Sequence, residues 1–343
     1  MTDSGVPRRI LVTRMKFIGD VVLTTPVIHA LRTAFPDASI SYMGDAAAVS
    51  LLRENPHLNE IIPFDFSRPT HLEQPRIAWL LRRQQFDWVI DLFGNPRSAL
   101  LTFLTGAPVR VGLERKGRGR LYTVQVRDDG KPKTAVEFHL QFLRAIGVQP
   151  STHRPELFLS GRERADAAAR FRSDRPVVAI HPGATWPAKM WLTERFARVA
   201  DELQNRHGVK VVLTGGPNDA DILDNVRSRT DPAVETVLNP PLRELAALYA
   251  VSGAVLSNDA GPMHIAAAVG TPTIALFGPG EENIWFPYEA SEGHRALRKD
   301  VPCHPCHLDF CNRTGDGFME CMKLLQVDEV VSAMVSALRS RRR

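Results

Sequence analysis

One stretch near the C-terminal end of the chain has the residue types expected of a diphosphate-binding turn. Ser257–Ala268 follows Ala254–Leu256, which has the apolar pattern of a buried strand, and leads into a helix expected to start near Ala266. A strand that passes through a glycine turn into a helix N-terminus presents free backbone N–H groups and the positive end of the helix dipole. The stretch therefore predicts a phosphate or diphosphate site. The simpler alternatives are a plain turn and, at His264, a packed helix histidine.

The candidate ligand-binding residues of this stretch begin with a carboxylate. Asp259 lies at the turn, where it can cap backbone amides or orient a hydroxyl of the ligand. The other candidates follow it directly: Ala260, Gly261, Pro262, Met263 and His264.

Two further loops should meet this turn along one edge of a parallel sheet. Gly183–Thr185 follows one strand pattern, and the loop that contains Gly216 follows the next. Open α/β sheets bind nucleotides at the edge where the carboxyl ends of their strands meet. Thr185 and Lys189 would place a hydroxyl and an ammonium near helix N-termini, which suits a phosphate. The alternative for Lys189 is a surface lysine.

The first half of the chain opens in a similar way. Arg9–Thr13 predicts a buried strand, Arg14–Asp20 a loop, and Val21–Phe35 a helix with Pro26 near its start or at a kink. Asp20 would then lie at a helix start on the sheet edge that binds ligands. The alternative for Asp20 is a plain N-cap.

Strand and helix patterns alternate along the whole chain, which predicts an α/β fold with two doubly wound parallel sheets. The proline-containing segment from Gly147 to Arg175 separates two similar halves. We therefore expect two Rossmann-like domains, residues 1–160 and 161–343. Further elements are expected at the following ranges: strands 39–43, 61–64, 88–92, 109–112, 176–181, 209–214, 254–256 and 272–277, and helices 46–53, 74–85, 135–146, 162–171, 193–205, 219–229, 241–250 and 327–339.

Bulk composition is that of an ordinary globular protein, with 343 residues, 44% hydrophobic and 24% charged. No stretch is long and apolar enough to span a bilayer, and the polar Met1–Arg9 leads straight into a strand without a signal-peptide pattern. We therefore expect a cytoplasmic protein. The formal net charge is +5, concentrated in Arg115–Arg120 and Arg339–Arg343. Such runs suit phosphates, anionic lipid or nucleic acid, or are simply solvated.

Several common motifs do not occur in the chain. There is no Walker A loop, no Gly-x-Gly-x-x-Gly fingerprint and no nucleophile elbow around a serine. These absences argue against a kinase-like NTPase, a standard NAD dehydrogenase and an α/β-hydrolase.

All four cysteines lie close together, at Cys303, Cys306, Cys311 and Cys321. In a cytosolic chain such a cluster suggests a metal site rather than disulfides, because a Cys-x-x-Cys pair puts two thiolates at chelating distance. The alternative, which we favour, is four reduced thiols without a metal.

Three runs together resemble the heptosyltransferases of glycosyltransferase family 9. Ile10–Arg14 with Ile18–Pro26 is similar to the N-terminal signature of that family, and Ser257–Ala268 resembles its donor diphosphate loop. His181–Ala184, with Lys189 and Trp191, resembles a third landmark. The runs occur in the family's order and spacing, and they cover essentially the whole chain.

The resemblance implies a GT-B fold, in which two Rossmann-like doubly wound domains face a central cleft. It also implies that the N-terminal domain takes the acceptor and that the C-terminal domain binds ADP-heptose. Asp20 would be the general base, and Lys189 and Asp259 would hold the donor. Ala260 stands where some members have Thr or Ser, so a hydroxyl contact at that position is not expected.

Inverting glycosyl transfer fits these roles. A carboxylate must take the proton of the acceptor hydroxyl, and the leaving ADP must be neutralised. Asp20 would do the first, and Lys189, Thr185 and the amides from Ala260 to Met263 the second. No cofactor or metal is required, and no Asp-x-Asp motif occurs in a metal-binding setting.

The expected acceptor is an anionic lipid-linked saccharide of the lipopolysaccharide inner core, met by the enzyme in peripheral contact with the inner membrane. Basic residues of the first half are expected to face its phosphates and carboxylates: Arg68, Arg76, Arg115, Lys116, Arg118 and Arg120. The alternatives are a family member with another nucleotide-sugar or acceptor, and a nucleotide-sugar 2-epimerase. A nucleic-acid-binding module is disfavoured, because the basic runs lack interleaved aromatic residues.

Overall fold

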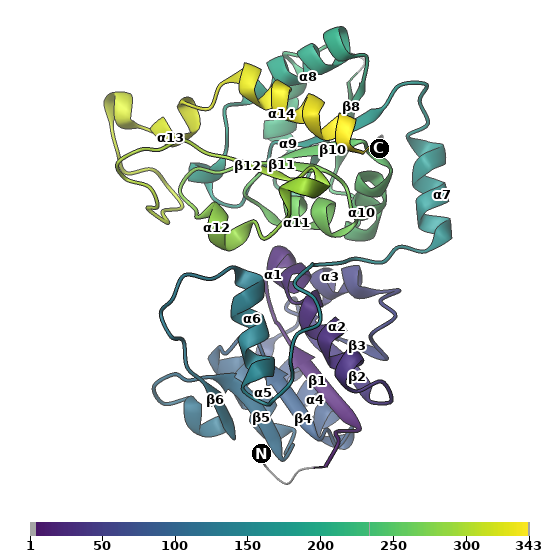
Figure 1. Cartoon of the computed structure of the whole chain (residues 1–343), viewed down its shortest axis with the longest axis vertical. Coiled ribbons are helices and arrows are strands. Elements are labelled where there is room, and N and C mark those ends of the chain that lie inside the picture. Colours follow the sequence, from purple (N-terminus) through teal and green to yellow (C-terminus); the bar gives the residue numbers. More distant parts are fainter. Residues whose placement is uncertain (1–4, 233, 342–343) are drawn as a thin grey trace. The chain divides into compact units, whose positions relative to one another are not determined.

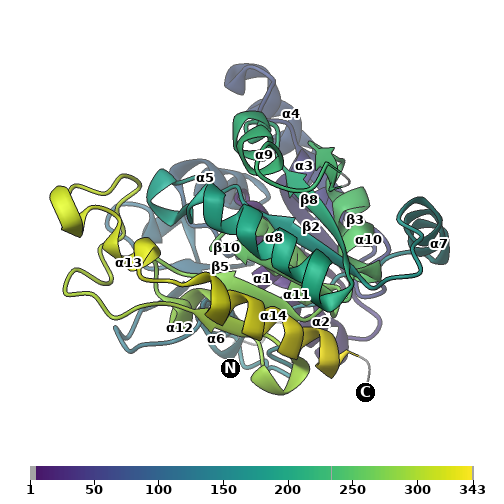
Figure 2. The ribbon, with the colours of Figure 1, turned by 90° about the horizontal axis from the view of Figure 1, so that it is seen from above.

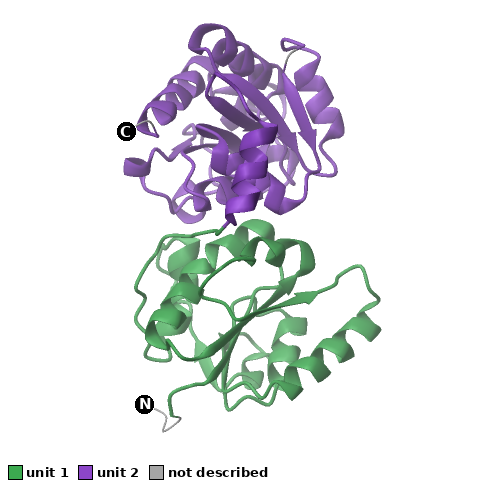
Figure 3. Cartoon of the chain, turned by 90° about the vertical axis from the view of Figure 1, so that its right-hand side faces the viewer, with its two compact units in different colours: residues 1–158 green, residues 159–343 purple. Residues whose placement is uncertain are grey.

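The computed structural model describes residues 5–232 and 234–341, which form two compact units, Met1–Phe158 and Leu159–Arg343 (Figure 3). The first four residues and the last two arginines of the basic run Arg339–Arg343 lie outside the described residues. None of the helices in the described part of the chain has the length and apolar character needed to cross a membrane.

Unit 1 is built on a parallel sheet in which the described strands pair in the order β3-β2-β1-β4-β5-β6. Helices α2 and α6 contact each other on one face of this sheet, and α4 contacts α5 on the other (Figures 1 and 2). Its elements are β1 (Arg9–Thr13), α1 (Ile18–Leu23), α2 (Thr25–Ala34), β2 (Ser39–Asp45), α3 (Ala46–Val49), η1 (Ser50–Leu52), β3 (Glu60–Phe64), α4 (Thr70–Arg83), β4 (Trp88–Asp91), α5 (Pro96–Leu104), β5 (Val109–Leu113), η2 (Gly119–Leu121), β6 (Val124–Val126) and α6 (Ala135–Arg144).

Unit 2 repeats this architecture, with described strands in the order β12-β11-β10-β7-β8-β9, again all parallel. Helices α8 and α14 lie side by side over one face (Figure 2). Its elements are α7 (Gly161–Arg170), β7 (Val177–His181), η3 (Pro187–Lys189), α8 (Thr193–His207), β8 (Lys210–Gly215), α9 (Ala220–Arg227), β9 (Glu235–Leu238), α10 (Leu242–Val251), β10 (Ala254–Asn258), α11 (Gly261–Ala268), β11 (Thr273–Leu276), α12 (Glu282–Trp285), η4 (Ala290–Glu292), β12 (Arg295–Leu297), η5 (Gly315–Gly317), α13 (Glu320–Lys323) and α14 (Val327–Ser340).

The central strands are buried on both faces, as their apolar runs predict. Every residue of β7 and β10 is buried, and so is β1 after its first residue. A strand covered by helices on both sides needs apolar residues at successive positions rather than at alternate ones. This burial keeps the central strands in place, so that only their carboxyl ends and the following loops are available for chemistry.

A buried carboxylate fixes the carboxyl edge of the first sheet. Asp91, at the end of β4, accepts hydrogen bonds from the hydroxyls of Thr13 (3.0 Å), Ser98 (2.8 Å) and Tyr122 (2.7 Å). It also accepts from the amides of Phe93 and Gly94. Five donors offset the desolvation of one buried charge. Together they connect β1, β4, α5 and the loop before β6.

Several expected helix boundaries are wrong. The loop expected at 14–20 is shorter, because α1 begins at Ile18, and the single helix expected at 21–35 breaks at Thr24. The hydroxyl of Thr24 bonds to the carbonyl of Val21 and to Tyr42, and Pro26 occupies the first turn of α2, where its missing N–H costs nothing. Helix α11 likewise begins at Gly261, five residues before the expected start at Ala266.

Several short elements were not predicted, among them three strands and helix α5. The short strands β6, β9 and β12 are recognisable only by their pairing with a neighbouring strand, which a local pattern does not reveal. Helix α5 did carry a signal: Asn95 accepts a hydrogen bond from the amide of Ser98 as an N-cap, and Pro96 follows at the first position.

Candidate functional site

An ion pair marks the candidate diphosphate site of unit 2. Lys189, at the end of η3, places its Nζ 2.7 Å from Oδ2 of Asp259, which follows β10. The Asp259 side chain is only 5% exposed, and no described residue gives its Oδ2 a directed hydrogen bond. Burial raises the pKa of Asp259, and Lys189 works against this shift. Lys189 therefore supplies the positive charge that compensates the buried carboxylate. Oδ2 of Asp259 can still accept a hydrogen bond from a further donor.

Gly280 leaves the space that the Lys189–Asp259 ion pair occupies. A Cβ added to Gly280 would lie 2.6 Å from Oδ2 of Asp259 and 3.8 Å from Nζ of Lys189. Any larger residue at this position would displace the carboxylate. The loop after β11 therefore approaches the ion pair with bare backbone.

The start of α11 offers fewer amides than the sequence suggested. Pro262 has no N–H, and the amide of Met263 already donates to the carbonyl of Ala260. The expectation that amides from Ala260 to Met263 would all meet a diphosphate is therefore wrong. The amides of Ala260 and Gly261 have no acceptor among the described residues, so these two stay available at the positive end of the helix.

His264 is buried in the first half of α11 and lies 2.8 Å, Nδ1 to hydroxyl, from Tyr288. Burial lowers the pKa of His264 to about 3, and the positive charge of Lys189 adds to this shift. At neutral pH His264 is an uncharged imidazole that packs inside unit 2. Its surroundings support the packed-histidine alternative as well as a role beside the ligand.

An asparagine holds the loop that carries Lys189. The side chain of Asn258 donates to the carbonyl of Pro182 (2.7 Å) and accepts from the amide of Trp191 (3.1 Å). Trp191 is buried and donates through its indole to the carbonyl of Leu325. The two ends of the loop are thus fixed to β10, whereas Thr185 within it is exposed.

The neighbouring loop after β8 is organised by Asp219. Its carboxylate accepts from the amide of Gly216 (2.7 Å) and lies 3.6 Å from Nε2 of His181. Burial lowers the pKa of His181 to about 4 despite this carboxylate. A Cβ on Gly183 would meet Asp219 at 2.2 Å. The amide of Gly216 is therefore engaged within the protein, and Asp219 is a half-buried residue that holds this loop together.

In unit 1, Asp20 is fixed by an arginine. Asp20 occupies the first turn of α1, where its carboxylate accepts from the amide of Phe17 (3.2 Å) and pairs with the guanidinium of Arg14. Arg14 also donates to the carbonyl of Leu92 and stacks on Phe93. The Asp20 side chain is 13% exposed. The carboxylate is accordingly both a cap of α1 and half of an ion pair.

Two of the expected acceptor-binding arginines are occupied by a buried glutamate. Arg76 forms two hydrogen bonds with Glu73, and Arg68 lies near both Glu73 and Asp65. Glu73 is fully buried, and the bonds from Arg76 lower its pKa. Arg68 and Arg76 are therefore partly neutralised within α4 and its preceding loop.

The basic loop after β5 is less constrained. Arg115, Lys116 and Arg120 are exposed, whereas Arg118 is half-buried. The loop lies at the carboxyl edge of the sheet, since it leads from β5 to Tyr122, which bonds to Asp91. Its exposed cations are therefore on the same edge as Asp20.

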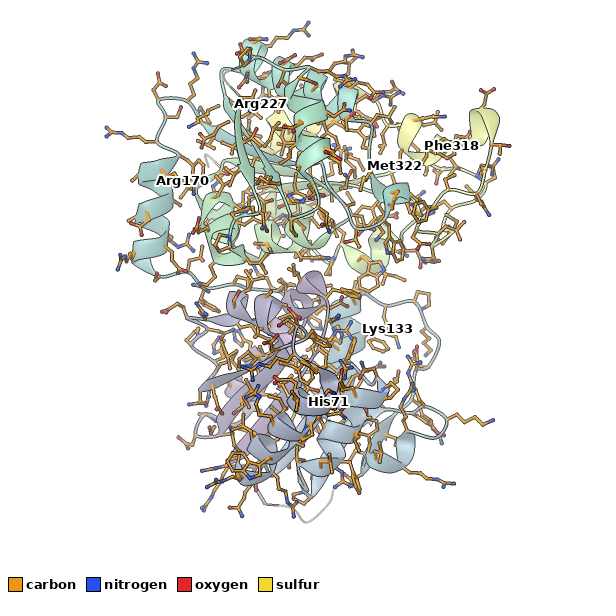
Figure 4. The ribbon with its side chains drawn as sticks, turned by 180° about the vertical axis from the view of Figure 1, so that it is seen from behind. His71, Lys133, Arg170, Arg227, Phe318 and Met322 are labelled. Carbon is orange, nitrogen blue, oxygen red and sulfur yellow. The ribbon has the colours of Figure 1, made fainter. Side chains whose placement is uncertain are left out.

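The four cysteines are half-buried and form no disulfide with one another. They lie in the segment of unit 2 before α14, whose outer part carries the exposed Phe318 and whose inner part carries the buried Met322 (Figure 4). Cys311 accepts from the amide of Met319. Among the described residues, these thiols do not lie as close together as a metal-binding group requires.

Sequence reasoning missed four residues that shape these sites: Arg14, Asp219, Gly280 and Tyr288. Arg14 and Asp219 each stand within a few residues of a predicted strand end, so their position was a usable signal. Gly280 and Tyr288 reach the site only through the packing of the chain after β11, which no local pattern shows.

Comparison with known proteins decides the family. The family model described as glycosyltransferase family 9 (heptosyltransferase) matches residues 76–313, which is more than half of the chain. The chain belongs to glycosyltransferase family 9. It is therefore a glycosyltransferase, as the resemblance of its motifs predicted.

Individual relatives of this family 9 enzyme match over most of its length. Lipopolysaccharide heptosyltransferase 2 of Salmonella typhimurium is 29% identical, and the match covers 94% of this chain and 100% of that protein. Lipopolysaccharide heptosyltransferase 3 of Escherichia coli is also 29% identical, over 80% of this chain and 84% of the relative.

Solved structures confirm the predicted fold class. The family 9 glycosyltransferase of Veillonella parvula matches with a TM-score of 0.84 at 26% identity, over 97% of each chain. The ADP-heptose lipopolysaccharide heptosyltransferase II of Escherichia coli matches with a TM-score of 0.82 at 25% identity, over 98% of this chain and 100% of that one. The family 9 enzyme thus has the two Rossmann-like domains of the GT-B fold.

The buried, neutral His264 makes a prediction about pH. Its pKa of about 3 in the folded enzyme lies below the ordinary 6.5, so the unfolded chain takes up the proton first as pH falls. Stability should therefore be lost from about pH 6.5 downward, by up to about 1.4 kcal/mol per pH unit for each such histidine. His264→Gln should show a shallower loss in urea unfolding between about pH 6.5 and 4.5. The exposed His207 provides the control, His207→Gln, which should keep the wild-type slope. Equal slopes for wild type and His264→Gln would contradict the assignment.

Proposed function

We propose that this enzyme transfers heptose from ADP-heptose to the inner core of lipopolysaccharide, with inversion at the anomeric carbon. The observation that carries the proposal is the similarity to lipopolysaccharide heptosyltransferases over almost the whole chain. The sites at the two sheet edges supply the groups that such a reaction needs.

Unit 2, within the predicted domain 161–343, is the donor-binding domain in this proposal. Lys189 lies against the diphosphate, and the amides of Ala260 and Gly261 approach its oxygens at the start of α11. Asp259 holds Lys189 in place and can accept from a hydroxyl of the sugar or ribose. Thr185 and Gly216 lie in the two neighbouring strand-end loops. A fixed cation and a helix N-terminus are the usual partners of a nucleotide diphosphate.

Unit 1, within the predicted domain 1–160, supplies the base. Asp20 takes the proton from the acceptor hydroxyl, while the hydroxyl oxygen forms its bond to the anomeric carbon of heptose. The bond from that carbon to the diphosphate breaks, and ADP leaves with the electron pair. Lys189 and the two amides stabilise the charge that develops on ADP. The chain's own groups serve every step, so we propose no cofactor and no metal in the reaction.

Arg14 positions Asp20 for this role. The ion pair with Arg14 and the amide of Phe17 fix the carboxylate at the first turn of α1. Arg14 therefore holds the carboxylate of Asp20 in one orientation.

The acceptor is an anionic saccharide in this proposal, and the exposed cations Arg115, Lys116 and Arg120 attract it. They share the carboxyl edge of the first sheet with Asp20. Arg118 contributes from a half-buried position, and Arg68 and Arg76 contribute less because Glu73 and Asp65 already neutralise them.

Peripheral contact with an anionic membrane is supported by a basic-apolar face on α4 and α5. Five large apolar side chains are exposed there: Leu72, Trp79, Leu100, Phe103 and Leu104. Arg83 stacks on Trp79 at 4.6 Å, and Arg110 on Phe103 at 5.6 Å. Arg82 links the helices by donating to the carbonyl of Thr105. The acid of α4, Glu73, is buried, and the sequence of α5 contains none, so the face complements anionic lipid.

Asp20→Asn tests the base directly. The change keeps the shape of the side chain and its capacity to cap α1 but removes its basicity, so turnover should fall by ~10²–10⁴ with ADP affinity little changed. The matched control is Asp45→Asn, which alters another helix cap at the end of a strand, and it should retain turnover. Near wild-type turnover by Asp20→Asn would refute the role.

Lys189→Ala tests the donor site. Loss of one charge-assisted contact should weaken binding of ADP and ADP-heptose by on the order of 1.5–3 kcal/mol in calorimetry. Lys210→Ala removes another paired lysine of unit 2 and should leave binding unchanged. Wild type should also bind ADP more tightly than UDP or GDP. Unchanged ADP affinity in Lys189→Ala would indicate a surface role, and preference for UDP or GDP would indicate another donor.

A triple change of Arg115, Lys116 and Arg120 to Ala tests the acceptor surface. The KM for the acceptor should rise and lose much of its salt dependence, because screened attraction to the acceptor has been removed. The KM for the donor should not change. A control variant neutralises three exposed arginines of unit 2: Arg162, Arg206 and Arg227. If the triple variant changed only the KM for the donor, the loop would not be part of the acceptor site.

The membrane contact is tested by sedimentation with phosphatidylglycerol-containing vesicles. Wild type should co-sediment, more strongly at low salt, and Trp79→Ser with Phe103→Ser should reduce the bound fraction several-fold because less apolar surface enters the lipid. Phe318→Ser removes an exposed aromatic residue of unit 2 and is the control (Figure 4). If wild type stays in the supernatant, or if the double variant binds as wild type does, the face has another role.

A further inference from the structure

Three metal-ligating side chains gather in unit 1, and none of them belongs to the residues assigned to the reaction. They are His29, His57 and Glu156, and their ligand atoms all lie within 4.8 Å of one another. Within residues 5–232 and 234–341, no other group of three His, Cys, Asp or Glu side chains meets this distance. We propose that the three residues form a binding site for a divalent transition-metal ion of the Zn²⁺ class.

The three ligands come from separate segments that are fixed independently. His29 lies on α2, and His57 follows η1. Glu156 belongs to the last segment of unit 1, where its amide donates to the hydroxyl of Thr25 at 2.9 Å. The ring of Phe158 packs edge-on against His57, with centroids 5.9 Å apart. Because the backbone contacts position these groups, their convergence does not depend on long flexible side chains.

The distances between the three ligand atoms are close to those around a coordinated zinc ion. Oε1 of Glu156 is 2.8 Å from Nδ1 of His29 and 3.3 Å from Nε2 of His57. Zinc bonds of about 2.0–2.1 Å in a tetrahedron separate neighbouring ligand atoms by roughly 3.3 Å. An ion entering the trio therefore needs only small side-chain rotations. It would replace the present hydrogen bond between His29 and Glu156.

The ligand types and their exposure favour zinc-like ions. Two imidazoles and one carboxylate form a ligand set that zinc uses in proteins, with water at the fourth position. The side chains of His29, His57 and Glu156 are 32%, 20% and 26% exposed, so an ion and its water can enter from solvent.

The charges around the trio allow binding. Nε2 of His57 lies 3.3 Å from Oε1 of Glu156, so this ring nitrogen is placed to coordinate an ion beside the carboxylate. Arg32 is the nearby cation, but its guanidinium is directed at backbone carbonyls, including those of Pro36, Ala38 and His57. Glu156 supplies the one negative charge that offsets the incoming ion.

A bound ion would join α2 to the end of unit 1. Helix α2 follows α1, which carries Asp20. The hydrogen bonds and ion pairs of the three ligand side chains are made with one another and not with the groups that we assign to catalysis. We therefore expect metal to stabilise unit 1 without changing turnover. Metal binding at these three residues does not depend on which donor or acceptor the enzyme uses.

The experiment titrates Co²⁺ into chelator-treated full-length enzyme in which Cys303 and Cys306 are replaced by Ser, which removes the Cys-x-x-Cys pair as a competing chelator. One equivalent should bind with the visible spectrum of nitrogen and oxygen ligation and without thiolate charge-transfer bands. Zn²⁺ should displace it and raise the thermal midpoint. Glu156→Gln and His57→Gln should each weaken binding at least about tenfold and remove the thermal shift.

A control variant tests a histidine–glutamate pair that lacks a third ligand. His153 lies 3.2 Å from Glu137, and His153→Gln should leave Co²⁺ binding unchanged. Circular dichroism shows whether each variant is folded. If Glu156→Gln or His57→Gln does not fold, His29→Gln replaces it as a ligand deletion. Absence of a stoichiometric Co²⁺ complex, or a complex that survives all three ligand deletions, would overturn the proposal.

Discussion

Parallel pairing of the central strands is the constraint on which both sites depend. In unit 1, β1 pairs with β2 and β4, and in unit 2, β10 pairs with β7 and β11. This pairing brings the carboxyl ends of neighbouring strands to one edge, so residues far apart in the sequence become neighbours. Asp91 and Asn258 then lock the two edges through side-chain hydrogen bonds to adjacent segments. The candidate site residues lie in loops and in the first turns of helices just after the strands, and the buried strands set the position of these segments.

Each edge carries an ion pair that includes a candidate site residue, and the two pairs differ in what they do. The Arg14–Asp20 pair is also bound to a carbonyl and an amide, which leaves the carboxylate oriented at the first turn of α1. The Lys189–Asp259 pair is more deeply buried at its acidic end, and burial raises the pKa of Asp259. A buried carboxylate with one cationic partner is poorly compensated. A ligand that brings hydroxyl donors and a diphosphate would satisfy both members of the pair, which gives unit 2 a physical reason to bind one.

The sequence predicted most of the fold because the central strands are uniformly apolar and the long helices are amphipathic. β7, β10 and β11 could be placed within one or two residues. The break at Thr24 could not, because it depends on the hydroxyl of Tyr42 from a neighbouring strand. Strands such as β12 exist only through pairing, and their three residues have no signature of their own.

Some residues of the candidate sites could also be predicted from the sequence. Asp20, Lys189 and Asp259 all follow strand ends, so their types and positions were sufficient to single them out. The partners that tune them were not: Arg14 reaches Asp20 only because α1 starts earlier than expected, and Gly280 reaches Asp259 from another strand end. Pro262 shows the opposite error, since the missing amide was visible in the sequence and its consequence at the helix start was overlooked.

The reaction that we propose is a single displacement that joins heptose from ADP-heptose to the acceptor. It is tested most directly by incubating the purified enzyme with ADP-heptose and heptose-free inner core. Mass spectrometry and NMR of the product then give the ADP released per heptose transferred and the anomeric configuration of the new linkage. A single displacement releases one ADP for each heptose and inverts the anomeric configuration relative to the donor. Retained configuration, or ADP release without a heptosylated product, would contradict it.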